Sequence, residues 1–460
     1  MASNVAEKTT DLPVVGSTAV PGRRRGRRGK ARPVGTGRDL PRARRQASGW
    51  EWGLAVVALF MLGRSPVLFY RERVAELFDL ERATGIWPDD AILRVTFAAL
   101  LLAIYVIAAR RCDPRTLLRQ PFLLMFLAWA VASVTWSIEP GVSLWRVAFF
   151  GGTAIFGWYL GERYAVKDIV GIVGAAAAIG ALVSVVALLA WPDRALATNR
   201  VEGLWSGAYV NRNLLGHAMA IGLVSLPFLW TTVPRRRRVF LIVIGVLQLF
   251  LLLRSGSRTP WVALGAAAAV GVPLLLVRKA TTRALNPSAG AFAVGLVTGY
   301  LALIVQWNWS VIVDWLDRST RLSGRTLMWS VVGYYVRMQP WRGWGFEAIW
   351  AHPPTIAVAQ TAYGKFPYSS HSGYLEVLIS TGWIGFGLFM AFVAMALWRT
   401  FRFAWEGRNG ASLWPLVFIV FALVTNVSES LFVSAEATWA ITVAAAVAAA
   451  RARRRRAAVS

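Results

Sequence analysis

Residues 371–398, HSGYLEVLISTGWIGFGLFMAFVAMALW, combine the two features that decide the fold of this chain. From Gly373 onward the stretch is mostly apolar and long enough to cross the hydrocarbon core of a membrane, which takes about 20 helical residues. Immediately before it stands His371, the last titratable group of a polar interval that runs from Asn308 to Ser372. Functional loops of this length usually rest on a rigid scaffold, so we expect the chemistry in this interval.

The whole chain is apolar. Of its 460 residues 56% are hydrophobic, 23 are Trp, and the mean hydropathy is +0.50, which is outside the range of soluble globular proteins. Mostly apolar runs of about 17 to 25 residues indicate an all-α polytopic membrane protein with about twelve transmembrane helices. The predicted runs are 51–69, 91–109, 118–136, 144–160, 168–191, 213–231, 239–253, 260–277, 290–307, 373–398, 413–431 and 433–450.

The basic residues indicate the orientation. An even number of crossings puts both termini on one side, and Lys and Arg collect in cytoplasmic segments. With a cytoplasmic N-terminus every basic cluster falls inside: Arg23 to Arg45, Arg110 with Arg111, Arg235 to Arg238, Arg278 with Lys279, Arg399 with Arg402, and Arg453 to Arg456. Residues 308–372, between the ninth and tenth predicted helices, are therefore expected to form one long extracytoplasmic loop.

Composition divides the chain into three parts. Residues 1–48 are rich in Arg, Gly, Pro and Ser and are expected to be a disordered cytoplasmic tail. Residues 49–450 form the predicted transmembrane domain, and residues 451–460 a second basic cytoplasmic tail. The net charge of +27 lies mostly in tails and cytoplasmic loops, where it fits a topology signal on anionic lipid. Membrane lipid is thus an expected partner and nucleic acid is not.

Several function classes lack their sequence signature. The single cysteine, Cys112, excludes an internal disulfide and a cysteine metal site. The chain has no Walker A motif, no Gly-rich dinucleotide fingerprint and no His-x-x-x-His pair, so ATP-driven transport and zinc proteolysis have no support. We expect neither a metal nor another cofactor.

Two arginines and one histidine are predicted at the outer face. Arg258 stands at the outer start of the eighth predicted helix, Arg325 in the loop, and His371 at the outer end of the tenth helix. Either Arg alone would more often be an interfacial side chain. Together they suggest an anion site, because guanidinium binds phosphate bidentately and stays charged. His217 and His352 are expected to be packed or structural.

Short motifs occur in order around the polar interval. They are Trp136–Arg146, Asn211–Gly216, Ser257–Trp261, Ser323–Arg325 followed by Trp329, Gly343–Phe346, His371–Glu376 and Thr381–Gly385. In their order and spacing they resemble the O-antigen ligase and Wzy-type polymerase superfamily of lipid-linked glycan transferases, over roughly residues 120–400. Two positions depart from that pattern: Arg212 stands where the family's Asn-Pro-Asn motif has Pro, and Ser372 where Asn often follows the His.

The resemblance implies an activity. It is a metal-independent, inverting transfer of a glycan from a polyprenyl-diphosphate carrier to an acceptor hydroxyl, on the outer side of a bacterial plasma membrane. Arg258 and Arg325 match the arginines expected to hold the diphosphate and offset the charge of the leaving group. His371 matches the histidine expected to contact or deprotonate the acceptor hydroxyl. The acceptor is a glycan, a lipid or a protein, and ligase and polymerase both fit the sequence.

A further set of residues is predicted to contact substrate: Arg146, Glu202, Asn211, Asn213 and Tyr374. Arg146 lies at the outer end of the fourth predicted helix, where it either orients the diphosphate or forms a structural ion pair. Tyr374 and the Trp residues of the loop either stack on sugar rings or belong to an interfacial aromatic belt.

Two other function classes stay open. A transporter or flippase of lipid-linked saccharide would have broken helices and a charged site in mid-membrane, and Arg64 and Arg94 fall inside predicted spans. A non-catalytic membrane scaffold would tolerate loss of Arg258, Arg325 and His371. We favour the transferase, because these charged residues lie at the outer face.

Overall fold

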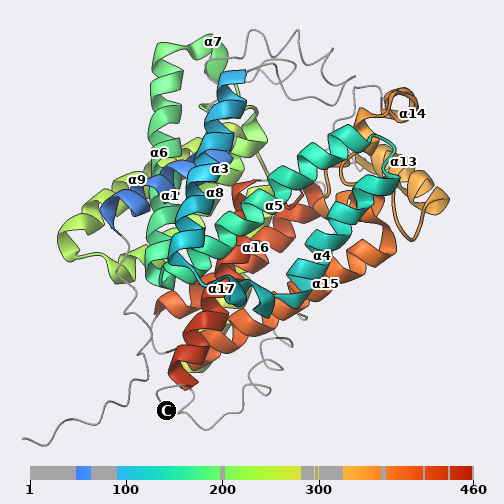
Figure 1. The fold of residues 1–460 in the computed structure, drawn as a ribbon. Coiled ribbons are helices and arrows are strands. Elements are labelled where there is room, and N and C mark those ends of the chain that lie inside the picture. The colour runs from blue at the N-terminus through green and yellow to red at the C-terminus, as the bar shows by residue number, and fades with distance from the viewer. Residues whose placement is uncertain are drawn as a thin grey trace, which may run out of the picture. The chain divides into compact units, whose positions relative to one another are not determined.

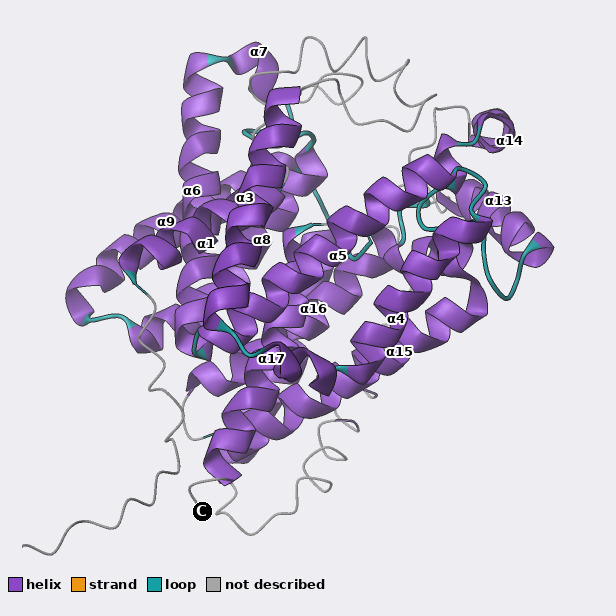
Figure 2. Ribbon diagram, in the orientation of Figure 1, coloured by secondary structure: helices purple, strands orange, loops and turns teal. Residues whose placement is uncertain are grey.

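The computed structural model describes residues 48–63, 91–196, 203–280, 295, 299, 325–363, 369–407, 410–433 and 436–457. At some of these positions, including Arg325, it describes the backbone alone. Within these ranges the chain is helical and contains no strand, apart from one isolated bridge between Leu196 and Trp205 (Figure 2). The all-α prediction is confirmed for this part of the chain.

Within the described ranges most consecutive helices are joined by short connections (Figure 1). The longer ones are α1 (Gly49–Leu62), α3 (Ala91–Arg111), α4 (Pro121–Ala132), α5 (Pro140–Arg163), α6 (Val166–Ala190), α8 (Arg212–Thr232), α9 (Arg235–Ser255), α10 (Thr259–Ala280), α13 (Arg325–Met338), α14 (Pro353–Tyr363), α15 (Gly373–Glu406), α16 (Trp414–Ser428) and α17 (Ala437–Ala457). The short ones are α7 (Pro192–Ala195) and the 3-10 turns η2 (Pro114–Arg119), η3 (Ser133–Trp136), η5 (Ile349–Ala351) and η6 (Gly410–Leu413).

Every predicted apolar run except 290–307 overlaps one of these helices; 290–307 lies outside the described residues apart from 295 and 299. Among the described helices, 6 are long and apolar enough to cross a membrane: 166–190, 212–232, 235–255, 259–278, 373–406 and 410–428. The chain is therefore a multi-pass membrane protein. The predicted count of twelve spans stays a prediction.

The seventh and eighth predicted spans, 239–253 and 260–277, are separate helices in the structure. Helix α9 ends at Gly256, which has a φ of 59° in the left-handed region that suits glycine, and α10 begins at Thr259. The guanidinium of Arg212 donates to the carbonyls of Ser255 at 3.4 Å and Gly256 at 3.0 Å. Because the last carbonyls of a helix have no partner within it, Arg212 completes the end of α9.

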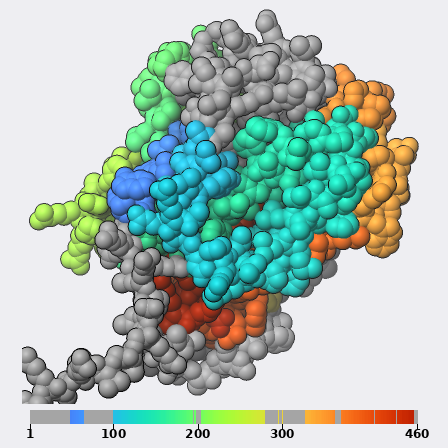
Figure 3. Space-filling view, viewed as in Figure 1, coloured from blue at the N-terminus to red at the C-terminus, as the bar shows by residue number. Residues whose placement is uncertain are grey.

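Helices α5 and α17 approach each other closely, and small residues explain this. A Cβ built on Gly157 would lie 2.4 Å from the carbonyl oxygen of Ala440, and one on Gly161 would lie 2.6 Å from Val447. Glycines four residues apart let two membrane helices approach backbone to backbone. In Figure 3 the teal residues of α4 and α5 lie on the face toward the viewer beside the blue and cyan residues of α1 and α3, and the orange residues of α13 and α14 lie at one end of it.

The C-terminal residues differ from the expectation. Residues 451–460 were predicted as a tail, but α17 continues as a helix to Ala457. Arg451 donates to the backbone carbonyls of Glu162 and Tyr164, and Arg453 donates to the Glu406 carboxylate at 2.9 Å. Hydropathy alone predicts that the spanning segment ends at the basic run. The helix continues because arginine is a good helix former and its side chain can reach neighbouring acceptors. The other predicted tail, residues 1–48, lies outside the described part except for Ser48.

Candidate functional site

The loop before α15 holds His371 in an unusual backbone conformation. Among the described residues only two that are not glycine have a positive φ, Glu347 at 51° and His371 at 54°. The left-handed region costs an ordinary residue about 1 kcal/mol or more and persists only where the surroundings impose it. Such residues cluster at functional sites.

Hydrogen bonds from three elements impose the conformation of this loop. The Glu376 carboxylate, which is buried in the first turn of α15, accepts from the Ser370 N–H and from the Trp350 indole N–H. The indole nitrogen lies 2.9 and 3.0 Å from the two carboxylate oxygens. On α13 the indole of Trp329 donates to the Ser370 carbonyl at 3.0 Å. Ser370, the residue before His371, is thus held through both its N–H and its C=O.

A second anchor lies at the end of α16. The Gly373 N–H donates to the Glu429 carbonyl at 3.0 Å, and the Asn213 amide donates to the Glu429 carboxylate at 3.4 Å. The hydroxyls of Thr259 and Ser428 share a hydrogen bond of 2.8 Å. Three predicted motifs, from the starts of α8, α10 and α15, therefore meet at Ser428 and Glu429.

Glu429 is the residue of this site that sequence reasoning missed. It falls within the predicted apolar run 413–431 and is partly exposed. A signal was present, because a carboxylate inside an apolar run of a membrane protein is costly and is usually functional.

The three predicted catalytic residues lie close to these anchors along the chain. Arg258 precedes Thr259, its side chain is exposed, and its carbonyl accepts from the Trp261 N–H at the start of α10. His371 stands two residues before Gly373. Arg325 begins α13 one helical turn before Trp329, hence on the same face of that helix.

A break in α15 organises the neighbouring part of the site. Gly382 has a φ of 65° within this helix, so carbonyls before it and N–H groups after it lose their helical partners. The turn after α13 replaces those partners. Trp344 and Gly345 donate to the carbonyls of Ile379 and Ser380, and Trp383 and Ile384 donate to the carbonyls of Pro340 and Trp341, at 2.8 to 3.3 Å.

The same turn contacts the segment that leads into α5. The Trp136 indole donates to the Arg342 carbonyl at 3.1 Å, and the Phe346 N–H donates to the Ser133 hydroxyl at 3.0 Å. Three further predicted motifs, 136–146, 343–346 and 381–385, are thereby brought together.

Arg146 is engaged by that turn. Its guanidinium donates to the Glu347 carbonyl at 2.9 Å and lies 3.8 Å from the Glu347 carboxylate. The structural ion pair, one of the two alternatives for Arg146, is thus present. The N–H of Glu347 donates to the Ser380 hydroxyl at 3.0 Å, which helps to hold its positive φ.

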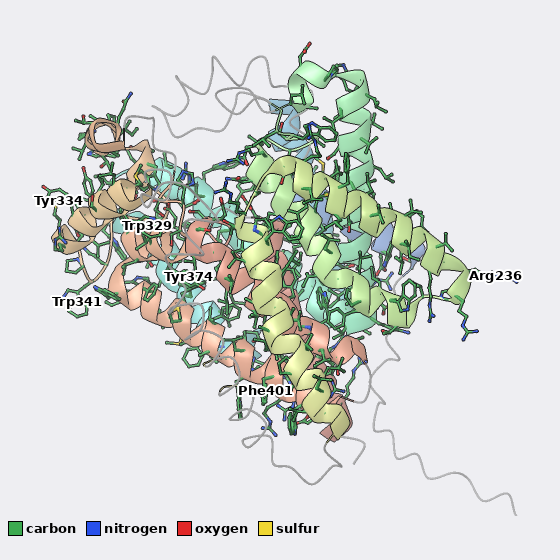
Figure 4. All side chains as sticks on the ribbon, turned by 180° about the vertical axis from the view of Figure 1, so that it is seen from behind. Arg236, Trp329, Tyr334, Trp341, Tyr374 and Phe401 are labelled. Carbon is green, nitrogen blue, oxygen red and sulfur yellow. The ribbon has the colours of Figure 1, made fainter. Side chains whose placement is uncertain are left out.

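The other predicted contact residues have structural partners. Asn211 caps α8, since its side chain accepts from the Leu214 N–H at 3.0 Å. The Tyr374 hydroxyl donates to the Leu423 carbonyl at 2.9 Å, and the side chain lies among the helices (Figure 4).

Just before Asn211, burial raises the pKa of Tyr209, whose hydroxyl therefore stays protonated. Glu202 and Arg64 lie outside the described residues, as does the side chain of Arg94.

The two remaining histidines are packed as expected. His217 is buried, its Nε2 lies 3.0 Å from the Thr438 hydroxyl, and its ring stacks on Phe421. His352 lies 3.3 Å from the Glu139 carboxylate. Within the described ranges, no group of three or more His, Cys, Asp or Glu side chains is arranged to hold a metal ion.

Part of the chain matches a known protein family. Residues 243–390 match the family model described as O-Antigen ligase. The matched part runs from α9 into the middle of α15 and includes Arg258, Arg325 and His371, whereas Arg146, Asn211 and Asn213 precede it. No curated protein matches the chain.

Proposed function

We propose, because residues 243–390 of this multi-pass membrane protein match the O-antigen ligase family model, that the protein transfers a glycan from a polyprenyl-diphosphate carrier to an acceptor hydroxyl. The proposed reaction takes place on the extracytoplasmic side of a bacterial plasma membrane, with both termini in the cytoplasm. The acceptor is a glycan, a lipid or a protein, so the enzyme is a ligase or a polymerase of cell-surface polysaccharide.

One observation supports this function most strongly. The motifs of Arg258 and His371 are far apart in the sequence, but both contact the end of α16, through Thr259 with Ser428 and through Gly373 with Glu429. Both motifs lie inside the matched family domain. A transferase needs its phosphate-binding cations and its base at one place, because proximity and orientation supply much of the rate.

In the proposed reaction the acceptor oxygen attacks the anomeric carbon from the side opposite the diphosphate, which inverts the configuration. The new C–O bond forms as the bond to the diphosphate oxygen breaks, and the electron pair stays on the leaving diphosphate. His371 takes the proton of the acceptor hydroxyl as general base. The guanidinium groups of Arg258 and Arg325 offset the charge on the leaving group, so the step needs no metal.

The remaining polar residues are proposed to shape the site. Glu429 and Asn213 form its wall between α8 and α16, where they can meet a substrate hydroxyl. Arg146 is held by Glu347 at the other side, and Asn211 fixes the start of α8. The inward hydroxyl of Tyr374 favours packing over sugar contact.

A transfer assay tests the proposal. Purified protein in nanodiscs would receive a polyprenyl-diphosphate oligosaccharide extract in the presence of EDTA, and carrier release and product length would be followed on a gel. We expect release by the wild type and its loss in Arg258→Ala, Arg325→Ala and His371→Ala. Arg254→Ala is the matched control, since this exposed arginine stacks on Trp205 at the end of α9.

The outcomes separate the alternatives. A ladder of products identifies a polymerase, and a single shift identifies a ligase. If the wild type releases no carrier from any native donor pool, and the three variants still complement a deletion strain, the enzyme proposal is wrong and a transporter or scaffold takes its place.

A further inference from the structure

Helix α13 has one face that is buried in a small core of its own. Met328, Val331, Val332 and Tyr335 pack with side chains of η5, α14 and α15, among them Ile349, Trp350, Ala359 and Ile379. This cluster is separate from the main core of the bundle. It holds α13 rigidly against the first turns of α15.

A neighbouring face of α13 is apolar as well, and it is exposed. Leu327, Tyr334 and Met338 lie on it, and Trp341 follows in the turn after the helix; Tyr334 is 51% and Trp341 67% exposed. At 100° per residue, positions 327, 334 and 338 fall within about 40° of one another on the helix. Figure 4 shows Tyr334 and Trp341 at the outer edge of the molecule. We call these four residues the α13 stripe.

The α13 stripe continues into a helix that is long and apolar enough to cross the membrane. The Ile384 N–H donates to the carbonyl of Trp341 at 3.3 Å, so the end of the stripe touches α15 beyond its break. Trp383 and Ile384 are themselves 48% and 43% exposed on α15. Exposed apolar side chains on a spanning helix face lipid, and the stripe extends that surface past the end of the span.

The composition of the stripe and its border matches a membrane interface. Trp and Tyr are enriched at the level of the lipid headgroups, where their apolar rings and polar tips are both satisfied. Arg337 and Arg342 are exposed beside the stripe, and arginine side chains at this depth can reach lipid phosphates. A helix that contacts lipid beside its contact with protein needs apolar residues on two adjacent faces, as α13 has.

We propose that α13 is an interfacial helix whose stripe of Leu327, Tyr334, Met338 and Trp341 inserts into the phospholipid leaflet nearest the candidate site. Sugar stacking would account for Tyr334 and Trp341 but leaves Leu327 and Met338 unexplained. A second copy of the chain could cover the same residues, but lipid is favoured because the stripe is continuous with the surface of α15.

The insertion has a consequence for the site, which rests on the proposed function. Helix α13 begins at Arg325, and its Trp329 holds the peptide before His371. A leaflet that fixes the depth of α13 therefore fixes both residues near the headgroup level. The diphosphate of a membrane-anchored carrier lies at that level, so the donor would enter sideways from the leaflet.

Spin labels test the insertion without any activity measurement. Cys112, the single cysteine, would be replaced by Ser, and one cysteine at a time introduced as Tyr334→Cys or Met338→Cys in the full chain. Ile384→Cys is the lipid-facing reference and Gln360→Cys, exposed on α14, the reference for water. Each nitroxide-labelled protein would be placed in phosphatidylethanolamine and phosphatidylglycerol vesicles, and its accessibility to oxygen and to a water-soluble nickel chelate measured.

We expect the ratio of oxygen to nickel accessibility at 334 and 338 to resemble that at 384 and to exceed that at 360 several-fold. A ratio like that at 360 would overturn the proposal, because the stripe would then face water. Low accessibility to both reagents, with spin–spin broadening at 334, would overturn it in favour of a second copy. Two labelled positions guard against one variant that fails to fold, and transfer activity has no influence on any outcome.

Discussion

The side-chain amide of Asn213, in the first turn of α8, donates to the carboxylate of Glu429, at the end of α16, across 3.4 Å. The carbonyl of the same Glu429 accepts from the Gly373 N–H, which starts α15. One residue therefore links the starts of two helices through two different groups. Substitutions of its side chain leave the backbone link to α15 in place.

Replacement of the Glu429 carboxylate should lower transfer without unfolding the protein. In Glu429→Gln the backbone bond to Gly373 remains, but the charge is lost; hydrogen bonds to charged groups are worth about 1.5–3 kcal/mol, so we expect turnover to fall roughly tenfold or more. The measurement is the initial rate of carrier release in nanodiscs. Glu406→Gln, which alters an exposed pair with Arg402 and Arg453, is the control and should keep full activity.

A swap of the two groups provides a sharper check on this contact. Asn213→Asp alone would place two carboxylates side by side and should lose activity. The double variant Asn213→Asp with Glu429→Gln restores a donor and an acceptor with their positions exchanged, and should recover part of the rate. If the double variant is no better than the worse single variant, the contact has no role in positioning.

Glu376 should be required for the stability of the His371 loop. It accepts from both Ser370 N–H and the Trp350 indole in a buried position. In Glu376→Gln the amide NH₂ would face one of these donors, and an unsatisfied buried donor costs about 1–3 kcal/mol. Thermal unfolding in detergent should show a lower midpoint.

A double-mutant cycle with Trp350→Phe isolates the bond between the two side chains. Residues in contact usually show a coupling energy of about 0.5–3 kcal/mol. Additive effects of Glu376→Gln and Trp350→Phe would contradict the contact. Glu139→Gln is the control. It alters the partly exposed contact between Glu139 and His352, and we expect it to change the thermal midpoint little.

Gly382 should tolerate no side chain, whereas Gly387 in the same helix should. A Cβ on Gly382 would lie 2.3 Å from the carbonyl of Trp341, and its φ of 65° is unfavourable for alanine. Around Gly387 nothing lies within 4 Å. We expect Gly382→Ala to lower the thermal midpoint and Gly387→Ala to leave it unchanged or raise it slightly. Equal effects of the two substitutions would show that the turn after α13 does not pack on the break.

The helices could be predicted from the sequence because their signal is local. The run after Ser372 is apolar, and α15 begins at Gly373 as expected, since a span must satisfy its own backbone in lipid. Helix α17 continues to Ala457, past the end of the predicted apolar run at residue 450. Hydropathy reports lipid contact, whereas Arg451 is held by the carbonyls of Glu162 in α5 and of Tyr164. Packing between distant segments is not visible in a local window.

The candidate site could be predicted only as a set of motifs. Arg258 and His371 were predicted because each stands at a boundary between apolar and polar sequence, and Arg325 because it lies in the polar interval between two predicted spans. Glu429 was missed, because its partners Asn213 and Gly373 come from helices far away in the chain. The stripe of α13 was also hidden, since an interval that is polar on average conceals a helix with apolar residues on two faces.

The buried ion pair between α1 and α5 should be among the largest single contributions to the stability of the bundle. Glu51 and Arg163 are both almost completely buried, with Nη2 and Nε of Arg163 each 3.0 Å from Oε2 of Glu51. Removal of one partner leaves a buried charge, which typically costs about 3–5 kcal/mol. The exposed pair of Arg402 and Glu406 should contribute at most about 1 kcal/mol. We therefore expect Arg163→Met to lower the thermal midpoint far more than Arg402→Met.

The double variant Glu51→Leu with Arg163→Met decides whether the loss comes from the charge or from packing. If the uncompensated carboxylate is the cause, the double variant is more stable than Arg163→Met alone, because apolar residues of similar volume can replace a buried pair at little cost. Arg111 lies 3.8 Å from Glu51 and is partly exposed, so it can soften the effect of Arg163→Met. A double variant that is less stable than Arg163→Met would show instead that packing around α1 depends on the length of the Glu51 side chain.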